Sequence, residues 1–144
     1  MSSREIKFRG RRLRTKEWMH GALIPSEFSH WNAPSIADRN FRYEVDKETI
    51  GQFTGYKDAT GREIYEGDII DFTVFDLNDT DTEHRGVVTF DSGWEIWKDT
   101  ATLFDGNIAY CLRWVWEQDE EIRVVGNVYD NPEMVVNDEA KEQS

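Results

Sequence analysis

Hydrophobic and polar residues alternate along much of this chain, and the alternation is strongest in its second half. The clearest example is IAYCLRWVW, residues 108–116, where Ile108, Leu112 and Trp116 would lie on the same face of a strand. Further short apolar segments lie at 64, 69–74, 87–90, 94–97 and 122–129. Because the side chains of a β-strand point alternately to its two faces, this pattern predicts a series of strands joined by turns.

The N-terminal segment shows the same period over a shorter distance. Apolar residues alternate with Lys and Arg in IKFRG, residues 6–10, and an apolar pattern resumes in WMHGALI, residues 18–24. This predicts a β-hairpin over residues 4–24 that turns near Thr15. Gly10 lies in the middle of its first strand, where glycine is typical of a β-bulge.

Residues 25–61 are expected to connect this hairpin to the strands of the second half. Up to residue 44 this segment is rich in Pro, Ser and Asn and shows no period, and Asp46 is a suitable N-cap for one short helical turn. The glycines that follow match neither the dinucleotide fingerprint nor the phosphate loop. DATG and YEGD are instead expected to form turns on either side of a short strand at 62–65.

These elements predict a mainly β, α+β protein with a single domain over residues 1–144. The hairpin leads into a small, twisted antiparallel sheet or partly open SH3-like barrel over residues 62–129. Within this core, FDSGWEIW at 90–97 is expected to form a tight hairpin. Residues 130–144 are expected to form a short helix, which begins after Asn131, and a polar tail.

Charge is unevenly distributed along the chain. Residues 1–65 carry a net charge of +3, whereas residues 66–144 carry −15. The acidic part repels phosphates, which disfavours general nucleic-acid binding, and the asymmetry also suggests self-association between basic and acidic parts. No apolar run is long enough to span a membrane, and the single Cys111 fits a reducing compartment. We therefore expect a cytoplasmic protein without membrane contact.

The predicted hairpin carries the strongest candidate interaction surface. It consists of Arg9, Arg11, Arg12, Arg14 and Lys16, with Trp18 close by. Alternation places Arg9 and Arg11 on one face, and Trp18 is able to stack on a nucleobase or on a guanidinium. A solvated hairpin tip, or a tip that docks on the acidic half of a second copy, explains the same residues and agrees better with the negative net charge.

Four tryptophans in the second half, Trp94, Trp97, Trp114 and Trp116, are expected mainly to fill the core. A stacking platform for bases would show the same pattern. Because Trp94 and Trp97 fall on opposite sides of one strand, at least one of them is expected outside the core, at an interface.

No group of residues matches a catalytic or metal-binding motif. The acidic segment 76–84 lacks the glycine and the glutamate of a calcium loop, and the three histidines are too dispersed for a zinc site. Cys111 is expected to be a buried, inert thiol, and Ser29 beside His30 lacks the elbow that presents a nucleophile. We therefore expect no catalytic site, no metal and no cofactor.

Four segments resemble the YopX protein family of phages and prophages. They are IKFRG at 6–10, EW at 17–18, ETIGQFTGYKDATGREIYEGDII at 48–70 and VVGNVYDNPEM at 124–134. The resemblance spans nearly the whole chain. It implies a phage or prophage origin and a self-contained fold, and it is compatible with an oligomer. The family has no assigned biochemical activity, so no catalytic positions carry over.

These observations favour a non-enzymatic accessory protein in the cytoplasm of the bacterial host. We expect it to bind another protein or to assemble with itself. Two alternatives stay open. One is a nucleic-acid-binding module that uses the basic hairpin, and the other is an acidic DNA mimic that inhibits a host enzyme.

Overall fold

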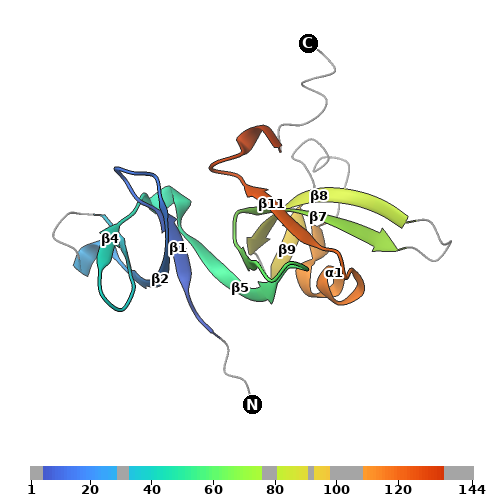
Figure 1. Ribbon diagram of the computed structural model, residues 1–144, viewed down its shortest axis with the longest axis horizontal. Coiled ribbons are helices and arrows are strands. Elements are labelled where there is room, and N and C mark those ends of the chain that lie inside the picture. The colour runs from blue at the N-terminus through green and yellow to red at the C-terminus, as the bar shows by residue number, and fades with distance from the viewer. Residues whose placement is uncertain (1–4, 29–32, 76–80, 91–92, 98–108, 135–144) are drawn as a thin grey trace, which may run out of the picture. The chain divides into compact units, whose positions relative to one another are not determined.

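The chain forms two compact units, and antiparallel β-structure dominates both (Figure 1). The computed structural model describes residues 5–28, 33–75, 81–90, 93–97 and 109–134. Unit 1 comprises Met1–Gly55 and unit 2 comprises Tyr56–Ser144. The expectation of a mainly β protein with short helices is confirmed. The expectation of a single domain stays a prediction.

Unit 1 is a sheet with the strand order β4-β3-β2-β1-β5. Its elements are β1 (Phe8–Arg11), β2 (Trp18–Ile24), η1 (Ser26–Phe28), β3 (Ser35–Ala37), β4 (Arg42–Glu44), η2 (Lys47–Thr49) and the start of β5 (Gly51–Lys57). The predicted hairpin is confirmed, because β1 and β2 pair antiparallel around a turn at Thr15. The connection expected over 25–61 is wrong in part, because it contains β3, β4 and β5. β3 and β4 have three residues each and are too short to show a period.

Gly10 allows close packing and does not form a bulge. The register of β1 and β2 continues through Gly10, which lies opposite Met19, so the predicted bulge is wrong. A Cβ atom at Gly10 would lie 2.8 Å from a methyl carbon of the buried Val45. Glycine therefore lets the Val45 side chain pack directly on the backbone of β1.

The helical turn predicted after Asp46 is η2. The Asp46 carboxylate accepts the backbone N–H of Glu48 at 3.1 Å, as an N-cap does. The buried Thr49 accepts the backbone N–H of Arg11 with its hydroxyl oxygen at 2.8 Å. The cap is therefore confirmed, and η2 is tied to β1.

Unit 2 is an open sheet with the order β10-β9-β8-β7-β11. Its elements are β6 (Glu63–Tyr65), β7 (Asp68–Phe75), β8 (Asp81–Phe90), β9 (Trp94–Trp97), β10 (Ala109–Cys111), α1 (Leu112–Gln118), β11 (Arg123–Asn127) and η4 (Pro132–Met134). β5 ends in this unit and is joined to β6. Of the two architectures expected for residues 62–129, the structure has the antiparallel sheet, and the strands in its described ranges close no barrel.

The turns predicted around β6 are confirmed, since Gly61 and Gly67 adopt positive φ angles of 91° and 92° on either side of it. Phe90 pairs with Trp94, so the predicted hairpin is confirmed too, although residues 91–92 lie outside the described ranges. The short helix expected after Asn131 is η4, a 3-10 turn.

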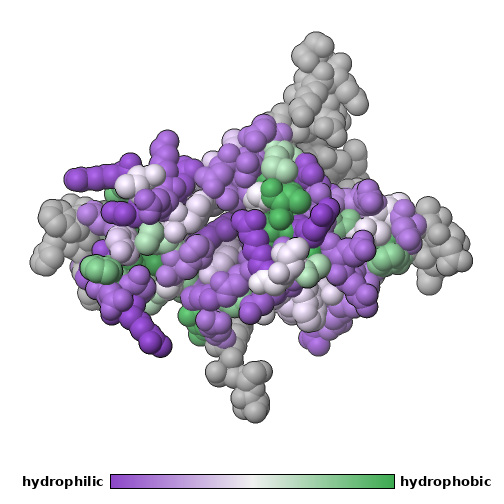
Figure 2. Space-filling view, viewed as in Figure 1, coloured by the Kyte–Doolittle hydropathy of each residue, from purple (hydrophilic) through white to green (hydrophobic). Residues whose placement is uncertain are grey.

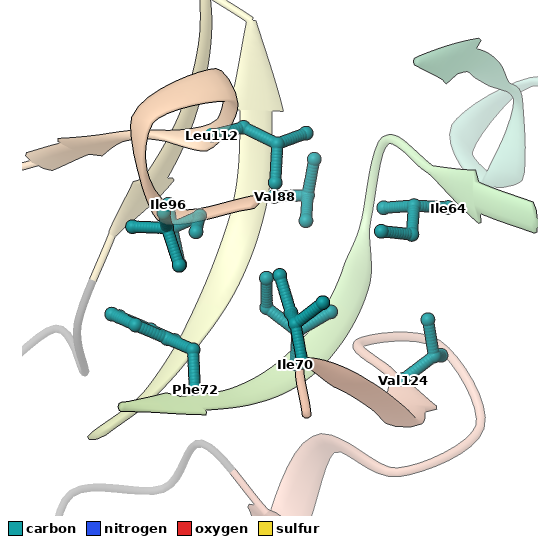
Figure 3. Close-up of a cluster of buried hydrophobic side chains, with 9 residues drawn as sticks. Ile64, Ile70, Phe72, Val88, Ile96, Leu112 and Val124 are labelled. Atoms are coloured by element: carbon teal, nitrogen blue, oxygen red, sulfur yellow. The ribbon is translucent and has the colours of Figure 1, made fainter. Parts of the chain in front are cut away.

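The core of unit 2 is a cluster of aliphatic side chains and one phenylalanine (Figure 3). Its buried members are Ile64, Ile70, Phe72, Val88, Ile96, Leu112, Val115, Ile122 and Val124. The labelled side chains point toward one another from β6, β7, β8, β9, α1 and β11. Burying one such side chain contributes about 1.5–3 kcal/mol, so this cluster is the main source of stability in the unit.

The long strand predicted over 108–116 is wrong in its second part. β10 ends at Cys111, and Leu112 begins helix α1. Leu112 and Val115 are three positions apart and both are fully buried, which a helix achieves and a strand does not. Aromatic and β-branched residues favour strands only weakly, and burial of these two side chains against the sheet outweighs that preference.

The end of α1 covers the edge of β7 where β11 no longer pairs with it. Pairing with β11 reaches only to Asp71. At Thr73, the Asp119 carboxylate accepts the backbone N–H at 2.8 Å, and the Gln118 amide donates to the backbone oxygen at 2.8 Å. Two side chains thus occupy the hydrogen-bonding groups that a neighbouring strand would use.

Cys111 is exposed, so the expectation of a buried thiol is wrong. Cys111 is still extended at the end of β10, and because its neighbour Tyr110 packs against the core, alternation points the Cys111 side chain to the other face. Because its side chain is exposed, we expect Cys111 to react with a chromogenic disulfide reagent while the protein is folded. The measurement is the absorbance of the released thiolate without denaturant. A reaction that requires denaturant would contradict this.

Candidate interaction surfaces

Arg9 of the predicted basic surface is buried within unit 1. Arg9 is only 4% exposed, and its guanidinium carbon lies 4.6 Å from the ring centroid of Trp18. Trp18 therefore stacks on a guanidinium, as the sequence suggested, but on one from its own hairpin. This cation–π contact fixes the two strands and leaves little of Arg9 for a partner.

The remaining basic residues of the hairpin divide into two groups. The guanidinium carbon of Arg12 lies 4.7 Å from the ring centroid of Tyr43, and Arg11 is half-buried. Arg14 and Lys16 are exposed in the turn, where Lys16 adopts a positive φ of 62°. The hairpin thus presents two exposed cations at its tip, and two of its arginines stack on aromatic rings of unit 1.

A second surface, on α1, was missed by sequence reasoning. Trp114 is 47% exposed and Trp116 is 41% exposed, although both were expected to fill the core. Because Leu112 and Val115 face the core, the two tryptophans between and after them face outward. We call this pair the exposed tryptophans; because residues two positions apart on a helix point to different sides of it, they are two separate exposed rings. Their only signal in the sequence was the spacing of Leu112 and Val115, and the alternation over residues 108–116 outweighed that signal.

Trp116 is held in place by two contacts within unit 2. Its indole N–H donates to the backbone oxygen of Lys57 at 2.8 Å. Its ring packs on Tyr56 with centroids 5.2 Å apart. The polar group of the indole is therefore satisfied inside the protein, and the exposed part of the side chain is apolar.

Trp114 belongs to a series of rings that reaches into the core. It stacks on Tyr110 at 6.4 Å between centroids, with the planes only 10° apart. Tyr110 contacts both His84 and Phe72, at 5.5 Å and 5.4 Å. Phe72 is buried, so the series connects an exposed tryptophan to the core and restricts its motion.

Unit 2 is strongly acidic. Residues 56–144 hold 7 Lys and Arg against 22 Asp and Glu, a net charge of −15, whereas residues 1–55 carry +3. On α1, Arg113 donates to the Glu117 carboxylate at 3.0 Å, and this hydrogen bond raises the pKa of Arg113. Hydrophilic residues predominate on the face drawn in Figure 2.

Asp58 joins the two long segments that carried the family resemblance. One carboxylate oxygen accepts the backbone N–H groups of Thr60 and Arg62, both at 2.9 Å. The other accepts the backbone N–H of Val124 at 2.9 Å. Burial raises the pKa of Asp58, but these bonds outweigh it and hold the pKa below its ordinary value. The matched segments therefore meet in a structural network.

Within the described ranges, no three His, Cys, Asp or Glu side chains gather as metal ligands would. In the same ranges, no helix is both long and apolar enough to cross a membrane. Residues 76–80 of the acidic segment, and Ser29 and His30, lie outside the description.

The fold and surfaces define a mainly β protein with a basic and an acidic unit and an exposed aromatic helix. A family model described as YopX protein matches residues 7–135, and the chain belongs to this family. The family resemblance stated from the sequence is thereby confirmed.

One solved structure shows the same fold. It is the crystal structure of protein EF1440 from Enterococcus faecalis, with a TM-score of 0.53 and 21% sequence identity. The match covers 92% of this chain and 99% of that chain. None of the curated proteins matched this sequence.

Proposed function

We propose that this chain is an accessory protein of a phage or prophage that acts by binding another protein and does not catalyse a reaction. The observation that carries the proposal is the exposure of two tryptophans of α1, Trp114 and Trp116. Tryptophan and tyrosine are enriched at protein interfaces and dominate their binding energy. Membership of the YopX family supports the phage or prophage origin.

Each of the two exposed tryptophans is suited to binding because its ring is already held in place. Trp116 is fixed by Lys57 and Tyr56, and Trp114 by Tyr110. Immobilising a flexible side chain on binding costs about 0.5–1.5 kcal/mol, and this cost is reduced when the side chain is held beforehand. Two exposed rings that are fixed in this way are costly to leave in water and inexpensive to bury.

The double variant Trp114→Ala, Trp116→Ala is expected to lose the partner. Removing a hot-spot tryptophan costs about 2 kcal/mol or more, so the affinity should fall by at least about thirtyfold. The measurement is quantitative affinity capture from bacterial cells that carry a related prophage. Phe75→Ala, which removes a 46% exposed aromatic residue of β7, is the matched control. Equal recovery of the same protein by both variants would refute the proposal.

Two observations bear on the alternatives from the sequence. Because Arg9 and Arg12 stack on Trp18 and Tyr43, a nucleic-acid-binding role of the hairpin rests mainly on Arg14 and Lys16. This makes nucleic acid the weaker alternative. The charge of unit 2 supports an acidic surface that attracts basic proteins, which is compatible both with self-assembly and with imitation of DNA.

A further inference from the structure

We propose that unit 1 binds single-stranded nucleic acid on a row of three side chains, Arg12, Tyr43 and Phe41, which we call the aromatic row. Bases stack on its rings, and arginines hold the phosphates. This inference goes beyond the proposed function, which uses the exposed tryptophans of unit 2, and does not depend on it. Three observations carry it: the contacts that join the row, the exposure of its outer ring, and the cations at its two ends.

The aromatic row is one continuous surface, because each member contacts the next. Phe41 directly precedes β4, and Tyr43 lies two positions further on, at the spacing that brings side chains to one face of an extended chain. Their ring centroids are 6.1 Å apart. The guanidinium carbon of Arg12 lies 4.7 Å from the ring centroid of Tyr43, and the backbone of Arg12 forms a bridge with Val45 at the end of β4. Two rings and a guanidinium from two segments therefore pack in series.

Phe41 is the exposed end of the row. It is 62% exposed, whereas Tyr43 is half-buried and lies in contact with both other members. The Phe41 ring thus rests on a neighbour that is itself held in place. Because every nucleobase has a π-face, an exposed ring of this kind binds bases with little preference for sequence.

Arg12 is able to hold a phosphate while it stacks on Tyr43. A guanidinium that lies over a ring uses its flat face, whereas its N–H donors lie in its plane and match the oxygens of a phosphate. Arg12 is half-buried, so part of its side chain is in contact with water. It differs in this from Arg9, which is 4% exposed. The hairpin alone offers few cations to a nucleic acid, but together with β4 it offers rings and a guanidinium on one surface.

Exposed cations follow the row at both ends. Arg39 is exposed in the turn before Phe41, and Arg14 and Lys16 are exposed in the turn after Arg12. Unit 1 as a whole carries a net charge of +3. A backbone of phosphates that passes along the row therefore meets cations before and after the rings.

The chemistry of the row favours a single strand over an acidic peptide and over a duplex. The faces of aromatic rings are negative, so they repel carboxylates and stack on planar bases. The carboxylate of the turn before Phe41, Asp38, is already compensated by two backbone N–H groups, at 2.7 Å and 2.8 Å. A duplex keeps its bases stacked on one another, so only its phosphates reach the row. A single strand satisfies the rings and the cations together.

The test uses the full chain and three fluorescent probes: an oligothymidylate of about twelve nucleotides, a duplex of the same length and a polyglutamate peptide. Fluorescence anisotropy is measured between about 0.05 M and 0.2 M salt, where the strength of phosphate contacts changes steeply. We expect the single strand to bind at least about fivefold more tightly than the duplex, which corresponds to one stacked base. Polyglutamate should not bind.

Variants separate stacking from charge. Phe41→Leu keeps an apolar side chain and removes the ring, and it should weaken binding of the single strand at least about fivefold. Phe75→Leu makes the same change at an exposed phenylalanine of unit 2 and should leave binding unchanged. Arg12→Gln and Arg39→Gln should each reduce the slope of log affinity against log salt by about 0.7. Far-ultraviolet dichroism verifies folding, and Arg39→Gln, in an exposed turn, decides the point if Arg12→Gln does not fold.

Each other outcome overturns the inference. Absence of binding at the lowest salt would exclude nucleic acid. Equal binding of the strand and the duplex, or an affinity that Phe41→Leu leaves unchanged, would show attraction by charge alone, and a salt slope that neither arginine variant changes would place the phosphates elsewhere. Polyglutamate that binds as tightly as oligothymidylate would identify an acidic peptide as the occupant. The proposed function is tested separately at Trp114 and Trp116, so each proposal can fail while the other stands.

Discussion

Replacing Asp58 with alanine is expected to destabilise unit 2 by about 3 kcal/mol or more. Hydrogen bonds to a charged group contribute about 1.5–3 kcal/mol each, and an unsatisfied buried donor costs about 1–3 kcal/mol. Asp58 is only 7% exposed and accepts the Val124 N–H from a strand far along the chain. Its loss releases both the turn at Thr60 and the attachment of β11.

The measurement is urea unfolding followed by tryptophan fluorescence. The control is Glu120→Ala, because Glu120 is an exposed carboxylate of the same unit, and changes at such positions usually stay within about 0.5 kcal/mol. A variant at Asp58 that unfolds at the same urea concentration as the control would show that the network contributes little.

The same residue makes a prediction about pH. The folded pKa of Asp58 is lowered, so the ionised carboxylate contributes stability that is fully present above the ordinary pKa of about 4. This contribution is lost as the pH falls through the lowered folded pKa. The stability difference between the wild type and Asp58→Asn should therefore be constant near neutral pH and shrink in acid. A difference that is independent of pH would exclude the carboxylate charge as its cause.

Replacing Gly21 with alanine is expected to prevent unit 1 from folding stably, at a cost of about 3 kcal/mol or more. A Cβ atom at Gly21 would lie 2.2 Å from the backbone oxygen of Ala37. That oxygen belongs to β3, which pairs with β2, so it cannot move away without breaking the pairing. A side chain could rotate out of the way, but a paired backbone cannot.

Gly55→Ala is the matched control in unit 1. Gly55 also has a positive φ, 92°, but a Cβ atom there would meet nothing within 4 Å. Its replacement should cost only the conformational strain, about 1–2 kcal/mol. The two variants are compared by thermal unfolding and by the amide spectrum of unit 1. If both lose the same stability, strain and not the contact with Ala37 explains the effect.

The elements that were predicted correctly depend on neighbouring residues. Strand β7 and the end of β8, from Val87 to Phe90, follow from alternating or continuous apolar runs of β-branched residues. The start of β8, from Asp81, is polar, and the sequence predicted no strand there. The turns around β6 follow from glycines that adopt a positive φ, and η2 follows from the capping side chain of Asp46. These preferences act within a few residues, so they are visible in the order of amino acids.

The candidate surfaces were predicted less well, because exposure depends on contacts across the sheet. Arg9 looked like a surface cation until the strand pairing placed Trp18 over it. Trp116 looked like core until α1 formed and Lys57 accepted its N–H. In both cases the contact joins residues from different elements, so the local sequence does not show which partner each side chain takes.

The sequence by itself determined that this chain is mainly β, where its tight turns lie, and that its front is basic and its back acidic. Only the tertiary structure decided that Leu112 begins a helix, that Cys111 is exposed and that Asp58 ties a turn to Val124. The physical reason is that hydrophobic burial is not directional. The repeating spacing of apolar residues along the sequence identifies the side chains that must be buried. The side chains that cover them come from distant segments of the chain.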